Sequence, residues 1–156
     1  NSCRQFLKFV ADIHKIDRKL LPQRIDYLLE LFNLSEAADD FTANYSFGMK
    51  KKIALAGIVI HDPKVLILDE PFNGLDPQAT RDFRNLLNDM VKKGTTVIFS
   101  SHVLEVVEKL VTHAGIIAHG QLKVSATLPE IIEKYGSLEK AFFDLSETAK
   151  QKDLQD

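Results

Sequence analysis

ILDEPFNGLDP, residues 67–77, is an apolar run that ends in acids. Asp69 and Glu70 stand side by side, and Pro71, an Asn-Gly turn and a third carboxylate at Asp76 follow them. Pro71 cannot donate to a sheet ladder and holds Glu70 in an extended conformation, so we expect a strand that stops where the acids begin. In open parallel sheets, ligand-binding groups gather outside the carboxyl ends of the strands. The acids are therefore candidate site residues.

A helix is predicted immediately downstream, from Asp76 to Lys93. Asp76 can cap this helix, Pro77 suits its first position and Gly94 ends it. A second apolar strand follows at residues 95–99. Strand, helix and strand make a βαβ unit, so we expect two parallel strands, each buried on both faces.

This βαβ unit places polar residues from two strands on one rim. Asp69 ends the first strand, while Ser100, Ser101 and His102 end the second. One acid of the adjacent pair could hold a metal and the other accept a proton. The alternative is that the acids only cap a turn and face water, that Asp76 is only a helix cap, and that His102 is structural.

The composition is typical of one globular domain, and its net charge does not indicate a particular class of binding partner. The chain has 156 residues, 45% of them hydrophobic, and a formal net charge of -2, so it can bury a sizeable core and carries no polybasic signal. Cys3 is the only cysteine, which excludes an intrachain disulfide. No apolar stretch reaches the roughly 20 residues that span a bilayer. We expect a soluble, cytoplasmic protein.

Two segments of different character meet near Tyr45. Before it, apolar residues recur at helical spacing without a strand signal. After Pro63, helical stretches alternate with short runs rich in Val, Ile and Leu, at residues 65–68, 95–99, 115–118 and 122–124. This pattern predicts an α/β fold with an N-terminal helical subdomain. The predicted parts are a helical subdomain (1–61), a partial α/β core (62–125), and C-terminal helices with a tail (126–156).

Residues 45–77, YSFGMKKKIALAGIVIHDPKVLILDEPFNGLDP, resemble the nucleotide-binding domain of ABC (ATP-binding cassette) ATPases. Residues 45–49 align with the family signature LSGGQ, residues 65–70 with the Walker B strand and its glutamate, and residues 73–76 with the D-loop. His102 aligns with the switch histidine. The resemblance implies a partial P-loop NTPase-type parallel sheet, and SLEKAFFDL near the C-terminus resembles bacterial exporter subunits.

The resemblance implies catalytic roles for residues on the predicted rim. Asp69 would help to hold Mg²⁺, usually through water, and Glu70 would be the general base that polarises the attacking water. His102 would contact the γ-phosphate of ATP and report whether it is present.

Further roles belong to the signature and the D-loop. Ser46 and Gly48 would bind the γ-phosphate of ATP held mainly by a second subunit, and Asp76 would lie at the subunit interface. A helix predicted to begin near Met49 supports the first role, because a helix N-terminus attracts anions. Phe47 and Met49 depart from the family's glycine and glutamine, which puts part of the phosphate contact in doubt.

The three lysines at positions 50–52 follow the signature segment. A charge run of this kind is normally a solvated helix face, and that is our expectation here. Their position on the signature helix gives a second interpretation, attraction to phosphate.

A P-loop requires Gly-Lys followed by Ser or Thr, whose backbone N–H groups, ammonium and hydroxyl hold phosphates and Mg²⁺. None of the seven glycines precedes a lysine, so these residues contain no Walker A motif. We expect a fragment of an ATPase domain that neither binds ATP tightly nor hydrolyses it alone. A missing neighbouring strand would leave an apolar edge beside the strand that ends before His102, so we also expect self-association.

The leading interpretation is part of the ATP-hydrolysing subunit of an ABC transporter. Its expected partners are a second ABC ATPase subunit and a transmembrane permease that holds it on the cytoplasmic face of the membrane, with coupling through residues 1–44. Nucleic acid is not expected. One alternative is a truncated binding module that acts in trans on an intact ABC subunit, and another is part of a soluble ABC protein without a transport role.

Overall fold

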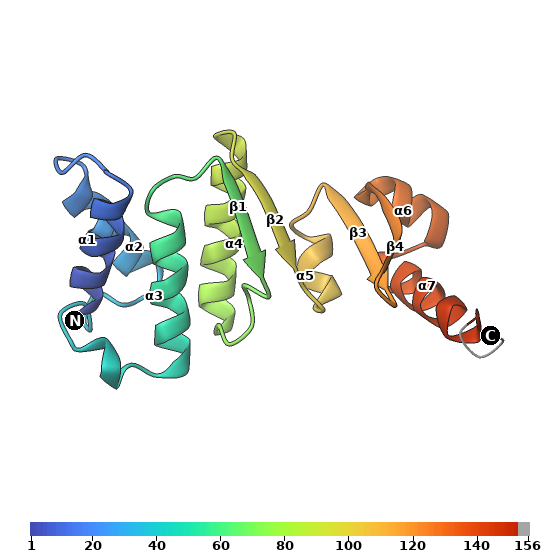
Figure 1. The fold of residues 1–156 in the computed structure, drawn as a ribbon, viewed down its shortest axis with the longest axis horizontal. Helices are drawn as coiled ribbons and strands as arrows, with labels where there is room; N and C mark the ends of the chain where they lie inside the picture. The colour runs from blue at the N-terminus through green and yellow to red at the C-terminus, as the bar shows by residue number, and fades with distance from the viewer. Residues whose placement is uncertain (153–156) are drawn as a thin grey trace. The chain divides into compact units, whose positions relative to one another are not determined.

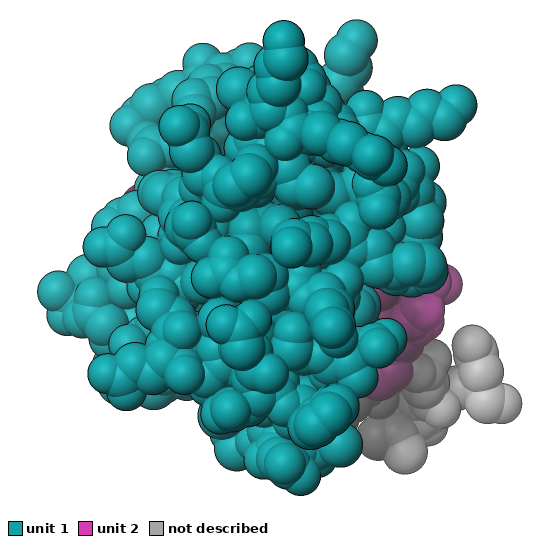
Figure 2. Space-filling view, turned by 90° about the vertical axis from the view of Figure 1, so that its left-hand side faces the viewer, with its two compact units in different colours: residues 1–101 teal, residues 102–156 magenta. Residues whose placement is uncertain are grey.

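The computed structural model describes residues 1–152, with side chains described up to Ser146, and the chain forms two compact units, residues 1–101 and 102–156 (Figure 2). The boundaries predicted after residues 61 and 125 were placed by the motifs in each segment, and they stay a prediction. The predicted tail falls partly on residues 153–156, which lie outside the described residues. Within residues 1–152, no helix combines the length and the apolar composition needed to cross a membrane.

The first unit begins with helices, as the apolar spacing predicts. Its helical elements are α1 (Cys3–Ile13), α2 (Leu21–Leu31), the 3-10 turn η1 (Thr42–Asn44) and α3 (Phe47–Val59) (Figure 1). Ser2 and Gln5 form a capping box at the start of α1, and Pro22 lies in the first turn of α2. Their fully buried apolar side chains make a common core: Leu7, Ile25, Leu29, Phe32 and Leu34.

A βαβ unit completes the first unit. Strands β1 (Val65–Asp69) and β2 (Thr96–Ser100) pair in parallel, and α4 (Pro77–Lys92) connects them (Figure 1). Asp76 begins α4, where its Oδ1 accepts a hydrogen bond of 2.8 Å from the Ala79 N–H. The predicted βαβ unit and its capped helix are confirmed.

The prediction that these strands are buried on both faces is wrong. Leu66 and Leu68 are buried, whereas the side chains of Val65, Ile67 and Ile98 are 56%, 74% and 54% exposed. Successive strand residues point to opposite faces of a sheet. Within residues 1–101, packing covers one face of β1 and β2 and leaves an apolar row on the other.

The second unit combines a hairpin with helices. Its elements are α5 (Leu104–Glu108), β3 (His113–Ala118), β4 (Gln121–Thr127), α6 (Leu128–Tyr135) and α7 (Leu138–Lys152). β3 and β4 are antiparallel and joined at His119 and Gly120, both with positive φ, as a tight hairpin turn requires. Buried apolar side chains form its core: Ile116, Leu128, Ile131, Leu138 and Ala141.

Candidate functional site

The carboxyl ends of β1 and β2 form an acidic rim, which we define as Asp69, Glu70 and Ser100. Asp69 and Ser100 are partners in the parallel register. The Ser100 hydroxyl donates a hydrogen bond of 2.5 Å to Asp69 Oδ1 and accepts one of 3.0 Å from the Glu70 N–H. The predicted meeting of Asp69 and Ser100 on one rim is therefore confirmed, and a single hydroxyl joins both acids.

Glu70 departs from the extended conformation that the following proline predicts. Its φ is 44°, in the left-handed region that non-glycine residues rarely adopt. The chain turns here, because the Glu70 carbonyl accepts a hydrogen bond of 3.3 Å from the Asn73 N–H. The local preference imposed by Pro71 is thus overridden by the reversal of the chain between β1 and α4.

The predicted signature segment lies directly against the predicted D-loop. Ser46 caps α3, and its hydroxyl oxygen accepts a hydrogen bond of 3.3 Å from the Met49 N–H. A Cβ on Gly48 would lie 3.3 Å from the Gly74 carbonyl oxygen, and a Cβ on Gly74 would lie 2.7 Å from Phe47 Cε1. The two glycines therefore permit a close approach that the sequence alone did not reveal.

The expectation of a solvated lysine face holds for Lys50, which is exposed, and is wrong for its two neighbours. Lys51 Nζ donates a hydrogen bond of 3.2 Å to the Glu70 carbonyl. Lys52 Nζ lies 2.6 Å from Asp76 Oδ2, and the Lys52 side chain is only 13% exposed. The first turns of α3 thus contact both ends of residues 70–76, the segment between β1 and α4 that we call the acidic loop. In the sequence, these contacts could have been suspected from two adjacent lysines that precede two acidic residues, Glu70 and Asp76.

Asp76 combines two interactions. The Lys52 ammonium and then the Ala79 N–H hold the pKa of its carboxyl below the usual range. The carboxylate therefore stays ionised at neutral pH, where it caps α4 and pairs with α3.

The structure gathers most of the predicted site residues in the first unit. Ser46 and Gly48 begin α3, whose lysines reach Glu70 and Asp76. His102 belongs to the second unit, immediately before Val103 and α5.

Asp69 on the rim fits a hard cation, and the N-terminus of α3 fits an anion. Asp69 is an exposed carboxylate whose oxygens suit Mg²⁺, a metal usually bound through one or two carboxylates together with substrate phosphates. Among the described residues, no group of three or more metal-binding side chains occurs, and a site that shares its metal with phosphates does not require one. The capped N-terminus of α3 adds backbone N–H groups that favour an anion.

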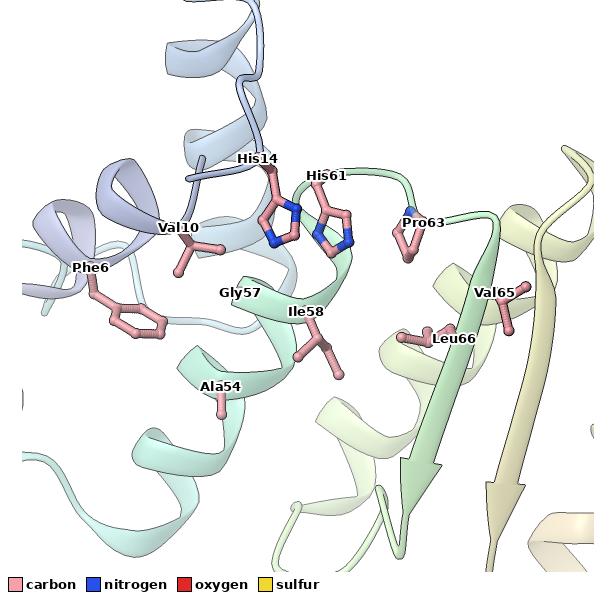
Figure 3. Close-up of a pocket in the computed structure, with 10 residues that line it drawn as sticks. All are labelled: Phe6, Val10, His14, Ala54, Gly57, Ile58, His61, Pro63, Val65 and Leu66. Atoms are coloured by element: carbon pink, nitrogen blue, oxygen red, sulfur yellow. The ribbon is translucent and has the colours of Figure 1, made fainter. Parts of the chain in front are cut away.

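A cavity of about 410 Å³ lies elsewhere in the first unit, lined by residues of α1, α3 and the start of β1 (Figure 3). Its lining is mostly apolar, but His14 and His61 stack there with ring centroids 3.7 Å apart and planes 6° apart. Burial, then His14 and Arg24, lower the pKa of His61, against an opposing effect of Asp62. No sequence pattern predicted this pair.

Comparisons with known proteins identify a family model and a set of similar proteins. A family model described as AAA domain, putative AbiEii toxin, Type IV TA system, matches residues 11–108. The chain is 39% identical over 123 residues to the uncharacterized ABC transporter ATP-binding protein YdbJ of Bacillus subtilis (strain 168), covering 78% of this chain and 39% of that protein. It is 38% identical to the bacitracin transport ATP-binding protein BcrA of Bacillus licheniformis, with the same coverage of 78% and 39%. The chain thus spans about two fifths of the length of these relatives.

Solved structures show the same relationship. One, titled as the structure of the ATP binding subunit of an ABC transporter, matches with a TM-score of 0.87 and 28% identity, over 93% of this chain and 62% of that one. CbiO1 from Clostridium perfringens, described as part of the ABC transporter complex cbiONQ, matches with a TM-score of 0.66 and 31% identity, over 85% and 53%. The chain therefore belongs to the AAA-domain family that the model describes, and the relatives that it resembles are ATP-binding proteins of ABC transporters.

Proposed function

We propose that this chain carries the water-activating and signature portions of an ATPase subunit that drives an ABC transporter. The observation that carries the proposal is the acidic rim, in which one serine hydroxyl joins Asp69 to the Glu70 backbone. Its connection to the N-terminus of α3 through Lys51 supports a common site for water activation and phosphate recognition.

Asp69 and Glu70 divide the chemistry of hydrolysis between them. Asp69 would hold Mg²⁺, which when bound neutralises charge on the phosphates. Glu70 would accept a proton from the water that attacks the γ-phosphate, as a general base does. His102 would donate a hydrogen bond to that phosphate and distinguish ATP from ADP.

The signature residues would act on nucleotide held mainly by a second ATPase subunit. Ser46 and Gly48 lie at the N-terminus of α3, where backbone N–H groups and the helix dipole favour a γ-phosphate. Asp76, at the adjacent N-terminus of α4, would contribute to the subunit interface.

These 156 residues contain no Gly-Lys pair and hence no Walker A clamp. We therefore expect the chain alone neither to bind ATP tightly nor to hydrolyse it. Isothermal titration calorimetry of the purified chain with Mg²⁺ and ATP tests this expectation. Micromolar affinity would contradict it, since the lysine and backbone cradle of a P-loop supply most phosphate contacts in such sites.

A second candidate is a binding module that completes the ATP site of an intact subunit in trans. The pairing of the α3 N-terminus with the acidic loop inside one unit favours this alternative, because both signature and interface residues are present. Adding the chain to a P-loop-containing ABC subunit and measuring ATP hydrolysis separates the candidates. The trans module predicts a change that Ser46→Ala reduces, and the leading proposal predicts none.

The proposed partner is a membrane permease, which would place the chain at the cytoplasmic face of the membrane. Helix α1 presents Phe9 and Ile13, one helical turn apart and 62% and 59% exposed, as an apolar contact surface. Co-purification with a membrane protein, lost on Phe9→Asp, is the expected result. Co-purification with a soluble translation or DNA-repair complex instead would favour the non-transport alternative.

A further inference from the structure

The peptide groups of Glu70 are held by side chains from two different elements. On one side, the Glu70 N–H donates to the Ser100 hydroxyl at the end of β2, at 3.0 Å. On the other, the Glu70 carbonyl accepts from the Lys51 ammonium on α3, at 3.2 Å. Ser100 and Lys51 are far apart in the sequence, so the tertiary fold brings both groups to this one residue.

The held residue is also strained. A φ of 44° places Glu70 in the left-handed region, and a following proline disfavours compact conformations of the residue before it. Strained residues of this kind are destabilising and persist only where surrounding contacts determine their conformation. The turn bond from the Asn73 N–H closes the loop, but it arises from the same segment of the chain. The contacts that hold Glu70 from outside this segment come from Ser100 and Lys51.

We propose that Lys51 and Ser100 are positioning residues that hold Glu70 in its left-handed conformation and so set the direction of its carboxylate. This inference rests on the proposed function, in which Glu70 accepts the proton of the attacking water. Lys51 has a further consequence, since it lies three residues after Gly48 on the helix that Ser46 caps. A shift of the signature turn on phosphate binding would move the donor that holds the base.

The lysine run supplies matched variants for the test. Lys51→Met removes the ammonium and keeps much of the apolar stem, while Lys51→Arg keeps a cationic donor. Lys50→Met removes the neighbouring exposed charge and serves as the control. Ser100→Ala removes the hydroxyl, and Ser100→Thr retains it.

The readout is the backbone conformation of Glu70 in the uniformly ¹³C,¹⁵N-labelled chain, from its Cα and Cβ chemical shifts and its HN–Hα coupling. Lys51→Met is expected to move the Glu70 signals toward extended values while the unfolding midpoint stays close to that of Lys50→Met. Lys51→Arg is expected to restore the wild-type signals, and Ser100→Ala to shift them where Ser100→Thr does not. Unchanged Glu70 signals in both Lys51→Met and Ser100→Ala would overturn the proposal.

This result is independent of whether the chain uses ATP. The conformation of Glu70 decides the positioning role of Lys51 and Ser100, whereas ATP titration and the trans assay decide the proposed function. A general loss of structure is recognised separately, because it would reduce the chemical-shift dispersion of signals throughout the first unit instead of shifting only those around residue 70.

Discussion

At the scale of single residues, the side chains that hold the acidic loop each make more than one interaction. The Ser100 hydroxyl bonds both the Asp69 carboxylate and the Glu70 backbone N–H. Asp76 caps α4 through one carboxylate oxygen and pairs with Lys52 through the other. Because these contacts share side chains, a substitution at one residue changes the surroundings of several.

Replacing Lys52 by Met should raise the pKa of Asp76, because the ammonium is the largest cause of its lowering. A lowered folded-state pKa stabilises the protein above the unfolded pKa, near the ordinary value of 3.8, and this stability is lost as pH falls through the folded value. At neutral pH the variant should lose about 1 kcal/mol or less, since the Asp76 side chain is 50% exposed and the pair is screened by solvent. NMR titration of the carboxyl and urea unfolding measure both effects. Lys50→Met, as control, should change neither.

His61 should make stability depend on mildly acidic pH. Its pKa lies below the ordinary 6.5, so the unfolded chain binds the proton more readily than the folded one. The contribution of neutral His61 is fully present above pH 6.5 and is lost as pH falls through the folded value, with a slope of at most about 1.4 kcal/mol per pH unit.

Urea unfolding of the wild-type chain between pH 5.5 and 7.5 measures this slope. His61→Gln should flatten it, and the exposed His113→Gln in the second unit should retain it. An identical slope in all three proteins would assign the pH dependence to other groups.

At the scale of elements, helix starts were predictable because they are local. Asp76 and Pro77 begin α4, as their side chains and fixed φ predict. Parallel pairing of β1 and β2 followed from the connecting helix. The left-handed Glu70 was not predictable, because contacts from Ser100 and Lys51 oppose the preference set by Pro71.

The start of α4 offers a test that separates its cap from its ion pair. Asp76→Ala removes both and should cost about 1–2 kcal/mol of unfolding free energy. Asp76→Asn keeps an oxygen for the Ala79 N–H but loses the charge that faces Lys52, so its cost should be smaller. Urea unfolding of the two variants measures the difference. Equal losses would mean that the ion pair, and not the cap, stabilises this end of α4.

At the scale of the whole molecule, burial was predicted less well than topology. Apolar strands between helices suggested burial on both faces, yet Val65, Ile67 and Ile98 are exposed. The sequence pattern shows that a strand is apolar. Whether each face of that strand is buried depends on elements that are distant in the sequence. The candidate site shows the same limit: motif order made Asp69 a candidate, whereas the lysine contacts to the acidic loop required the fold.

The exposed strand face leads us to expect self-association of the purified chain. Within residues 1–152, β2 pairs only with β1, so one strand edge and one apolar face are both available. Light scattering should show a mass that rises with protein concentration. Ile67→Thr combined with Ile98→Thr should lower this mass, and Val91→Thr, on the surface of α4, should not. A stable monomer at all concentrations would refute the expectation.

The contact between Phe47 and Gly74 places unequal limits on how the two positions can vary during evolution. Gly74 is restricted twice, by a φ of 77° and by the ring 2.7 Å from where its Cβ would lie. Phe47 is 76% exposed, so smaller residues can replace it without opening a cavity. Truncating the ring removes one restriction at Gly74 and leaves the backbone one. We therefore expect position 47 to tolerate substitution more readily than position 74, where a side chain would be strained even after the ring is removed.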